Sequence, residues 1–185
     1  MMKKTLEMKK LNIGCGNEIK DGYLNVDFVK QPGVDLVVDL EKFPWPFKDN
    51  TFEEVYASHV LEHVVDLIKT MKEIHRISKK GAKIVIRGPH FSCGVSYRDP
   101  THKRFFSYFT FEYFTKIKDY YSRAEQGLFK ITRRKLNFTR LAFPFLNKIF
   151  NPLINANPEI YERFFCWMLP CSEALFELEV LKKAP

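Results

Sequence analysis

The 185-residue chain lacks any uninterrupted apolar run close to the roughly 20 residues that a membrane-spanning helix needs. Its first ten residues, MMKKTLEMKK, also lack the apolar core of a signal peptide. The four cysteines form no CxxC pair and no zinc-binding spacing, so neither disulfides nor a cysteine-based zinc site is expected. These absences predict a cytoplasmic protein whose thiols stay reduced.

Basic residues outnumber acidic residues, which gives the chain a formal net charge of +8. This charge alone suits an anionic substrate, nucleic acid, an anionic membrane surface or simple solubility. No appended RNA-binding motif and no NPPY-like clamp accompany it, so nucleic acid is not favoured. The ordinary composition, with 45% hydrophobic and 28% charged residues, predicts a single globular domain over 1–185.

The most informative motif is LNIGCG at 11–16, which is followed by an acidic residue, Asp27, after a second apolar run. A strand that ends in Gly14-Cys15-Gly16 gives a tight turn whose backbone N–H groups can approach a ligand closely. A carboxylate at the tip of the next strand can accept hydrogen bonds from ribose hydroxyls. The motif therefore predicts a nucleotide-like cofactor.

Further segments follow in order: VDLVVDLEKFPWPFKDNTFEEVYASHVLEHV, a long helical stretch and KKGAKIVIRGPH. In order and spacing, residues 9 to about 118 resemble class I S-adenosylmethionine-dependent methyltransferases, and most closely the small type 11 group. The resemblance implies the activity and the cofactor S-adenosylmethionine. The cofactor-binding positions it implies are Asn12, Gly14, Cys15, Gly16, Asp27, Asp39, Leu40, Ser58 and His59.

Within that implied site, Asp27 holds the ribose, while Asp39 and Leu40 lie beside the adenine. Ser58 and His59 line the methyl-donor pocket. The chain departs from the family pattern at Asn12, where an acidic residue is common, and at 17–18, where Asn-Glu replaces a third glycine. Neutral Asn12 removes one partner for the ammonium group of the cofactor.

Ligands of such sheets bind beyond the carboxyl ends of the strands, so loops after the fourth and fifth strands are candidates for chemistry. They contain His59, His63, His90 and His102. The segment 99–104, DPTHKR, also resembles one at the pocket mouth in this methyltransferase group. We expect His102 or His90 to act as the base, with contributions from His59 and from Asp99, which orients a histidine or binds the acceptor. The alternative is a hydrogen-bonded loop in which Asp99 caps a turn.

The sequence HVLEH at 59–63 matches the HxxEH signature of inverted zinc metallopeptidases. It directly follows a predicted strand of the methyltransferase pattern, and no third ligand stands at a recognisable spacing. No metal is therefore expected. A site formed by His59, His63, His90 and His102 remains an alternative.

Hydrophobic periodicity predicts α/β architecture, with one long helix over 61–79, stopped by Gly81, and a second over 110–118 with Thr110 as its N-cap. The predicted strands are 10–14, 23–28, 35–39, 53–57, 82–87, 128–138 and 174–183. Connections between the first three strands are too short for crossover helices. We therefore expect an abbreviated doubly wound, Rossmann-like, mostly parallel sheet whose helices share one face.

The aromatic stretch 139–170 precedes the last strand and is broken by three prolines. It is expected to form an insertion with short helices at 144–150 and 157–168 that covers the bare face beside the first three strands. A homodimer interface or a peripheral membrane contact are the alternatives.

The sequence thus predicts S-adenosylmethionine-dependent methyl transfer to a small acceptor, anionic or linked to a lipid or sugar. Arg98, Lys103 and Arg104 favour the anionic acceptor. The competing hypotheses are a non-catalytic S-adenosylmethionine-binding module and an RNA-binding or RNA-modifying protein.

Overall fold

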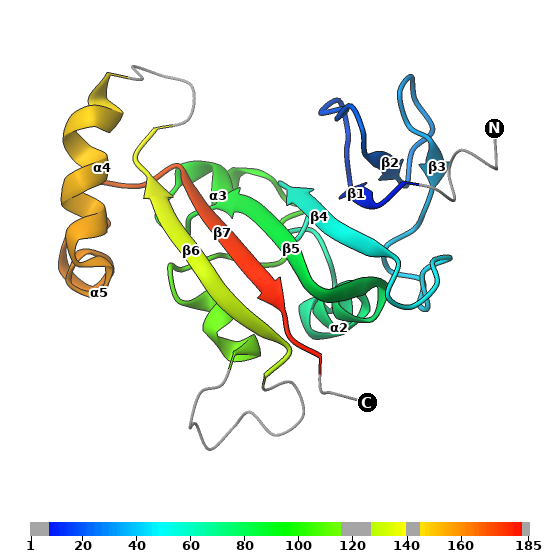
Figure 1. Cartoon of the computed structure of the whole chain (residues 1–185). Helices are drawn as coiled ribbons and strands as arrows, with labels where there is room; N and C mark the ends of the chain where they lie inside the picture. The colour runs from blue at the N-terminus through cyan, green and yellow to red at the C-terminus, as the bar shows by residue number, and fades with distance from the viewer. Residues whose placement is uncertain (1–7, 116–126, 140–144, 183–185) are drawn as a thin grey trace.

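The fold is an α/β arrangement around one twisted sheet, seen in a computed structural model that describes residues 8–115, 127–139 and 145–182 (Figure 1). The strands are β1 (Lys10–Ile13), β2 (Leu24–Asp27), β3 (Leu36–Val37), β4 (Phe52–Ser58), β5 (Ser78–Pro89), β6 (Phe129–Asn137) and β7 (Glu173–Val180). The helical elements are α2 (Leu67–Ile77), α3 (Gly94–Arg98), the 3-10 turn η1 (Thr110–Phe114), α4 (Leu146–Ala156), α5 (Pro158–Ile160) and the π-helical turn η2 (Tyr161–Phe165).

The seven strands lie in the order β3-β2-β1-β4-β5-β7-β6. The pairs from β3 to β5 are parallel, while β7 runs antiparallel to both β5 and β6. All seven predicted strands are present, and the sheet is mostly parallel. The carboxyl ends of β1, β2 and β4 therefore meet at one edge.

The early connections contain no helix in the described part of the chain, which confirms the abbreviated pattern. The loop after β1 is held instead by two buried asparagines. Asn12 donates to the Glu18 carbonyl at 2.8 Å and to the Asn25 amide oxygen at 2.9 Å, and Asn25 also accepts from the Lys20 N–H. Side-chain amides thus satisfy loop backbone that a crossover helix would have satisfied internally.

One face of the sheet carries the apolar core, α2 and η1. Met71, Ile74 and Ile77 of α2 are fully buried in it. On the same face Phe111 of η1 packs on Phe176, with ring centroids 4.7 Å apart, and Phe114 lies edge-on to Phe129. The expectation that α2 and the later helical turn share a face is confirmed.

In the part of the chain that the structure describes, the opposite face is lined by ion pairs and tyrosines rather than by a helical layer. Glu54 accepts from the Tyr23 hydroxyl at 2.6 Å and pairs with Lys10 at 3.1 Å. Further along the sheet Glu177 pairs with Lys83 and Arg133. Because polar residues alternate with core residues on these strands, this face does not need apolar cover.

The prediction that 139–170 covers β1–β3 is wrong. In Figure 1 α4 and α5 lie at the β6 end of the sheet, opposite to β1–β3. Three asparagines at helical spacing on α4 explain the position. Asn155 and Asn151 accept from the backbone N–H groups of Leu136 and Phe138 at 2.8 Å, and Asn147 accepts from Thr139 at 3.0 Å. Their side chains pair with the end of β6 and the two residues after it, at an edge that has no neighbouring strand among the described residues.

Helix boundaries differ from the predictions for local reasons. The helix predicted over 61–79 begins only at Leu67, because the Asp66 carboxylate caps it by accepting from the Lys69 N–H, and it ends at Ile77, where β5 begins. Thr110 is inside η1 rather than its N-cap, and its hydroxyl accepts from the Ser107 N–H. The part of the predicted 110–118 helix beyond 115 lies outside the described residues.

The predicted helices of the insertion are shifted. The first one, expected over 144–150, is α4, which continues through Pro152 because Asn151 and Asn155 on either side of the proline are anchored to β6. The second, expected over 157–168, is the short α5 and η2, capped by the Asn157 side chain.

The insertion leaves large apolar side chains at the surface: Phe145, Ile149, Leu153, Ile160, Phe164, Phe165, Trp167 and Met168. A homodimer through this segment stays a prediction, and sedimentation equilibrium tests it. Among the described residues, no helix is long and apolar enough to cross a membrane.

Replacing Asn151 by alanine tests the anchoring of α4. The variant leaves the Phe138 N–H without its acceptor, so the free energy of unfolding should fall by about 1–3 kcal/mol. Urea denaturation measures this. The control Leu153→Ala removes an exposed side chain of the same helix and should change stability by less than about 0.5 kcal/mol. Equal losses in both variants contradict the anchoring role.

Candidate functional site

The turn after β1 is a tight backbone loop with two glycines in the left-handed region, Gly14 at φ 58° and Gly16 at φ 46°. A Cβ on Gly14 would lie 2.2 Å from a methyl carbon of Val60, so this turn touches the loop after β4. A Cβ on Gly16 would meet nothing within 4 Å. Backbone open to approach at Gly16 is what a bound nucleotide-like cofactor requires, and the turn fits S-adenosylmethionine in this respect.

Asp27 lies at the end of β2 with its carboxylate against this turn. Its two oxygens accept from the backbone N–H groups of Gly16 at 2.8 Å and of Val29 at 3.0 Å. A carboxylate has about four acceptor positions, so two remain for ligand hydroxyls. The structure thus places Asp27 beside the glycine turn.

The side chains of two other predicted cofactor-binding residues, Asn12 and Cys15, hold or pack the loop after β1. Asn12 is buried, and its amide hydrogens hold the loop after β1. Cys15 is also buried, and burial together with the nearby Asp27 carboxylate raises the pKa of its thiol to about 11. The thiol therefore stays protonated at neutral pH and packs beneath the turn rather than reacting.

The predicted adenine side of the site lies after β3. Leu40 is half-buried, and the Asp39 carboxylate is exposed, with its pKa lowered by the Glu41 backbone N–H and by Lys42. The sequence analysis missed Phe28, which follows Asp27 directly and is 74% exposed. An exposed aromatic ring at this edge offers a face for a purine, and its position after the acidic residue was the available signal.

Ser58 is the last residue of β4, and the loop that follows begins with His59, which has a positive φ of 51°. This turn carries Val60 against Gly14. Both ring nitrogens of His59 lie near buried carboxylates, Nδ1 3.2 Å from Glu62 and Nε2 3.0 Å from Glu173. His59 is therefore positioned beside the cofactor turn by two acidic partners.

Sequence reasoning missed a polar network that continues from His59 across the strands. Glu173 of β7 also accepts from Arg87 at 2.9 Å and from Asn137 at 3.1 Å. Arg87 reaches the Tyr56 hydroxyl, which donates to Glu18 at 2.8 Å. Alternate polar positions in the strands were the only sequence signal, because the partners come from β4, β5, β6 and β7 and from the loops after β1 and β4.

The ionisation of Glu173 depends on this network. Burial alone would raise the pKa of its carboxyl, but hydrogen bonds from His59 and Arg87 and the charge of Arg87 lower the pKa to about 2. The pKa of Glu18 is also lowered against burial, by the hydroxyls of Tyr56 and Ser58. Both carboxylates are charged at neutral pH.

The expectation that His90 acts as a base is not supported by its surroundings. His90 has no exposed surface. Its Nδ1 is 2.8 Å from the Ser92 hydroxyl and its Nε2 is 3.1 Å from Glu162. Glu162 also accepts from the Ser107 hydroxyl and the Tyr108 N–H, so His90 fastens the insertion to the loop after β5. In this structure His90 is buried with both ring nitrogens engaged, and its role as a base stays a prediction.

The remaining predicted site residues, His63, Asp99 and His102, lie together in or beside the loop after β4. The loop 99–104 is tied to the loop after β4, because the backbone N–H groups of Lys103 and Arg104 donate to the Glu62 carbonyl. The His102 ring lies 4.7 Å from the His63 ring. Asp99 accepts from the Thr101 backbone and hydroxyl, and these bonds lower the pKa of its carboxyl. Asp99 thus caps its turn, as the alternative hypothesis expected.

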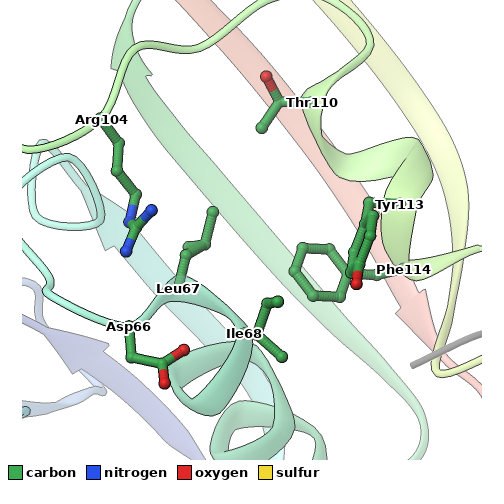
Figure 2. Close-up of a pocket in the computed structure, with 7 residues that line it drawn as sticks. All are labelled: Asp66, Leu67, Ile68, Arg104, Thr110, Tyr113 and Phe114. Carbon is green, nitrogen blue, oxygen red and sulfur yellow. The ribbon is translucent and has the colours of Figure 1, made fainter. Parts of the chain in front are cut away.

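A surface pocket lies elsewhere, on the helical face of the sheet. Figure 2 shows it between the start of α2, Arg104 and η1. Its lining residues are Asp66, Leu67, Ile68, Arg104, Thr110, Tyr113 and Phe114. None of these is a predicted cofactor residue. The pocket therefore shares no residue with the predicted cofactor site, although Arg104 belongs to the segment 99–104.

Comparison with known proteins supports a methyltransferase domain. Residues 15–86 match a family described as a methyltransferase domain. A sterol 4-C-methyltransferase from Caenorhabditis elegans is 39% identical over 51 residues, 28% of this chain and 15% of that protein. An uncharacterised protein from Methanocaldococcus jannaschii is 49% identical over 41 residues, 22% of this chain and 18% of that protein. The matches span less than a fifth of these curated relatives.

Solved structures share the fold over nearly the whole chain. A SAM-dependent methyltransferase from Archaeoglobus fulgidus has a TM-score of 0.58 at 17% identity, over 96% of this chain and 90% of that one. An S-adenosylmethionine-dependent methyltransferase from Mesorhizobium loti has a TM-score of 0.56 at 14% identity, over 96% and 95%. The [4+2]-cyclase SpnF has a TM-score of 0.59 at 15% identity, over 93% and 74%.

The lowered pKa of Glu173 predicts a pH dependence of stability. The stabilisation is present above the ordinary glutamate pKa and is lost as the pH falls from about 4.5 toward about 2. The loss in the free energy of unfolding should total roughly 3 kcal/mol, and Glu173→Gln should remove this pH dependence. Urea unfolding between pH 6 and pH 3 should show about 2 kcal/mol of this loss, with Glu179→Gln on the same strand as the control. Parallel pH profiles for the wild type and Glu173→Gln contradict the account.

Proposed function

We propose that this chain, which has the class I S-adenosylmethionine-dependent methyltransferase fold and matches the methyltransferase domain family over residues 15–86, methylates a small acceptor. One observation carries the proposal. The open backbone at Gly16 and the Asp27 carboxylate lie beside the loop after β4, whose Val60 touches Gly14. A cofactor-binding turn and a set of histidines therefore share one edge of the sheet.

S-adenosylmethionine supplies an electrophilic methyl group on a sulfonium. Asp27 would bind the ribose hydroxyls, and Phe28 and Leu40 would contact the base. His59, His63 and His102 would line the side from which the acceptor enters. His102 would accept the proton of an acceptor hydroxyl. Asp99 and Ser96 position His102: Asp99 caps its loop, and the Ser96 carbonyl lies 3.1 Å from His102 Nδ1. In-line transfer mainly requires orientation and exclusion of water.

The acceptor is proposed to be small and anionic, with an apolar or sugar-linked portion. Arg98 and Lys103 are exposed near the candidate mouth, in the segments that flank Asp99. Tyr97 and Phe105 form an exposed ring pair with centroids 4.6 Å apart. Positive charge beside an apolar surface suits an acceptor that carries a carboxylate or phosphate on an apolar body.

Cofactor binding tests the assignment of Asp27. Asp27→Ala should weaken the binding of S-adenosylmethionine and S-adenosylhomocysteine by about 1.5–3 kcal/mol, because hydrogen bonds to a charged group are lost. Isothermal titration measures both ligands. Asp21→Ala removes an exposed carboxylate from the same region and should leave the affinity unchanged. Wild-type affinity in Asp27→Ala rejects the proposed ribose site.

Turnover tests the role of His102. A screen of small anionic acceptors for release of S-adenosylhomocysteine identifies a substrate for this measurement. With that acceptor, His102→Ala should lower kcat/KM roughly 100-fold while the Kd for S-adenosylmethionine stays constant. Full turnover in the variant excludes His102 from the reaction.

A further inference from the structure

Three potential metal ligands meet at the carboxyl edge of the sheet. Glu62 and His63 come from the loop after β4, and His102 comes from the loop 99–104. One ligand atom from each lies within 4.8 Å of the others. In a zinc site with bond lengths of about 2.1 Å the ligand atoms are about 3.3 Å apart, so small side-chain rotations would close the set around one ion.

Of the three potential ligands, the Glu62 carboxylate gives the strongest indication of a bound cation. The residue is 1% exposed, and neither carboxylate oxygen has a hydrogen-bond partner among the described residues. His59 Nδ1 lies 3.2 Å from one oxygen, a contact that is an ion pair only when His59 is protonated. Burying a carboxylate without hydrogen bonds is costly. A bound cation would offset that cost.

Neighbouring groups set the tautomers of both histidines. His102 Nδ1 lies 3.1 Å from the Ser96 carbonyl, which only accepts, so Nδ1 carries the proton. The Thr101 hydroxyl donates to Asp99 at 2.7 Å and therefore accepts from His63 Nδ1 at 2.9 Å. Each neutral ring is left with a lone pair on Nε2. Such second hydrogen bonds typically orient histidines that bind metals.

We propose that Glu62, His63 and His102 bind one divalent transition metal ion, such as Zn²⁺, Fe²⁺ or Co²⁺. Two imidazoles and one carboxylate form a donor set that these ions accept, and it leaves positions open for another ligand. The HVLEH motif is not helical here, because α2 begins only at Leu67. The third ligand, which the sequence spacing did not indicate, is supplied by His102.

The site also suggests how the acceptor is held, a consequence that rests on the proposed methyltransferase function. An acceptor hydroxyl or carboxylate oxygen could occupy an open position on the ion. Coordination would lower the pKa of a bound hydroxyl, so its proton would leave to solvent water and His102 would act as a metal ligand rather than as the base. The exposed Arg98 and Lys103 would contact the remaining charge of such an acceptor.

The test titrates the chelator-treated full chain with Co²⁺ and Zn²⁺, followed by visible absorption for Co²⁺ and by calorimetry for Zn²⁺. We expect one ion per chain. Glu62→Gln and His102→Ala should weaken binding roughly 100-fold or more, and Thr101→Ala, which removes the partner of His63, by about tenfold. Glu53→Gln and His75→Ala, which change residues outside the cluster, should bind as the wild type does. Circular dichroism verifies that each variant is folded.

The absence of stoichiometric binding at 100 µM metal would overturn the proposal, as would equal losses in the cluster and control variants. Titration with S-adenosylmethionine separates this result from the proposed function. Cofactor binding without metal binding rejects only the metal site. Metal binding without cofactor binding supports the metal site and rejects the methyltransferase assignment.

Discussion

The contact between the turn after β1 and the loop after β4 determines how the candidate site is assembled. Only a residue without a side chain fits at Gly14, because Val60 occupies the space where a Cβ would lie. His59 makes the contact possible through its left-handed backbone, and it is held there by two buried carboxylates. The same loop then presents Glu62 and His63 and anchors the segment that carries His102. The glycine turn after β1, the loop after β4 and the loop that carries His102 are therefore fixed to one another.

The missing crossover helices have consequences beyond the cofactor site. Asn12 and Asn25 satisfy the loop after β1, and the face of the sheet without a helical layer carries ion pairs such as Glu54 with Lys10. Helix α4 of the insertion lies instead at the β6 edge of the sheet, where its asparagines pair with the backbone at the end of β6. Polar side chains thus satisfy the early loop backbone and the edge of the sheet in place of further helices or strands.

Much of this architecture could be predicted from local patterns. The strands were predictable because apolar runs and glycine turns bound them, and Asp27 was predictable from its place after the second run. The roles of Glu173 and Glu162 could not be predicted, because their partners are distant in sequence. The burial of His90 could not be predicted either, since position after a strand does not reveal burial, and its role as a base stays a prediction. The placement of 139–170 was wrong because apolar content suggested cover, whereas the asparagine spacing decides the location.

The central claim is that one edge of the sheet binds the cofactor and presents the acceptor. A crystal structure of the complex with S-adenosylhomocysteine tests it most directly. The account predicts ribose hydroxyls on the Asp27 carboxylate, the amino acid portion along Gly14–Gly16 and the sulfur facing the loop that contains His59 and His63. A ligand bound instead in the pocket between α2 and η1, or with its sulfur directed away from the histidines, would contradict the account.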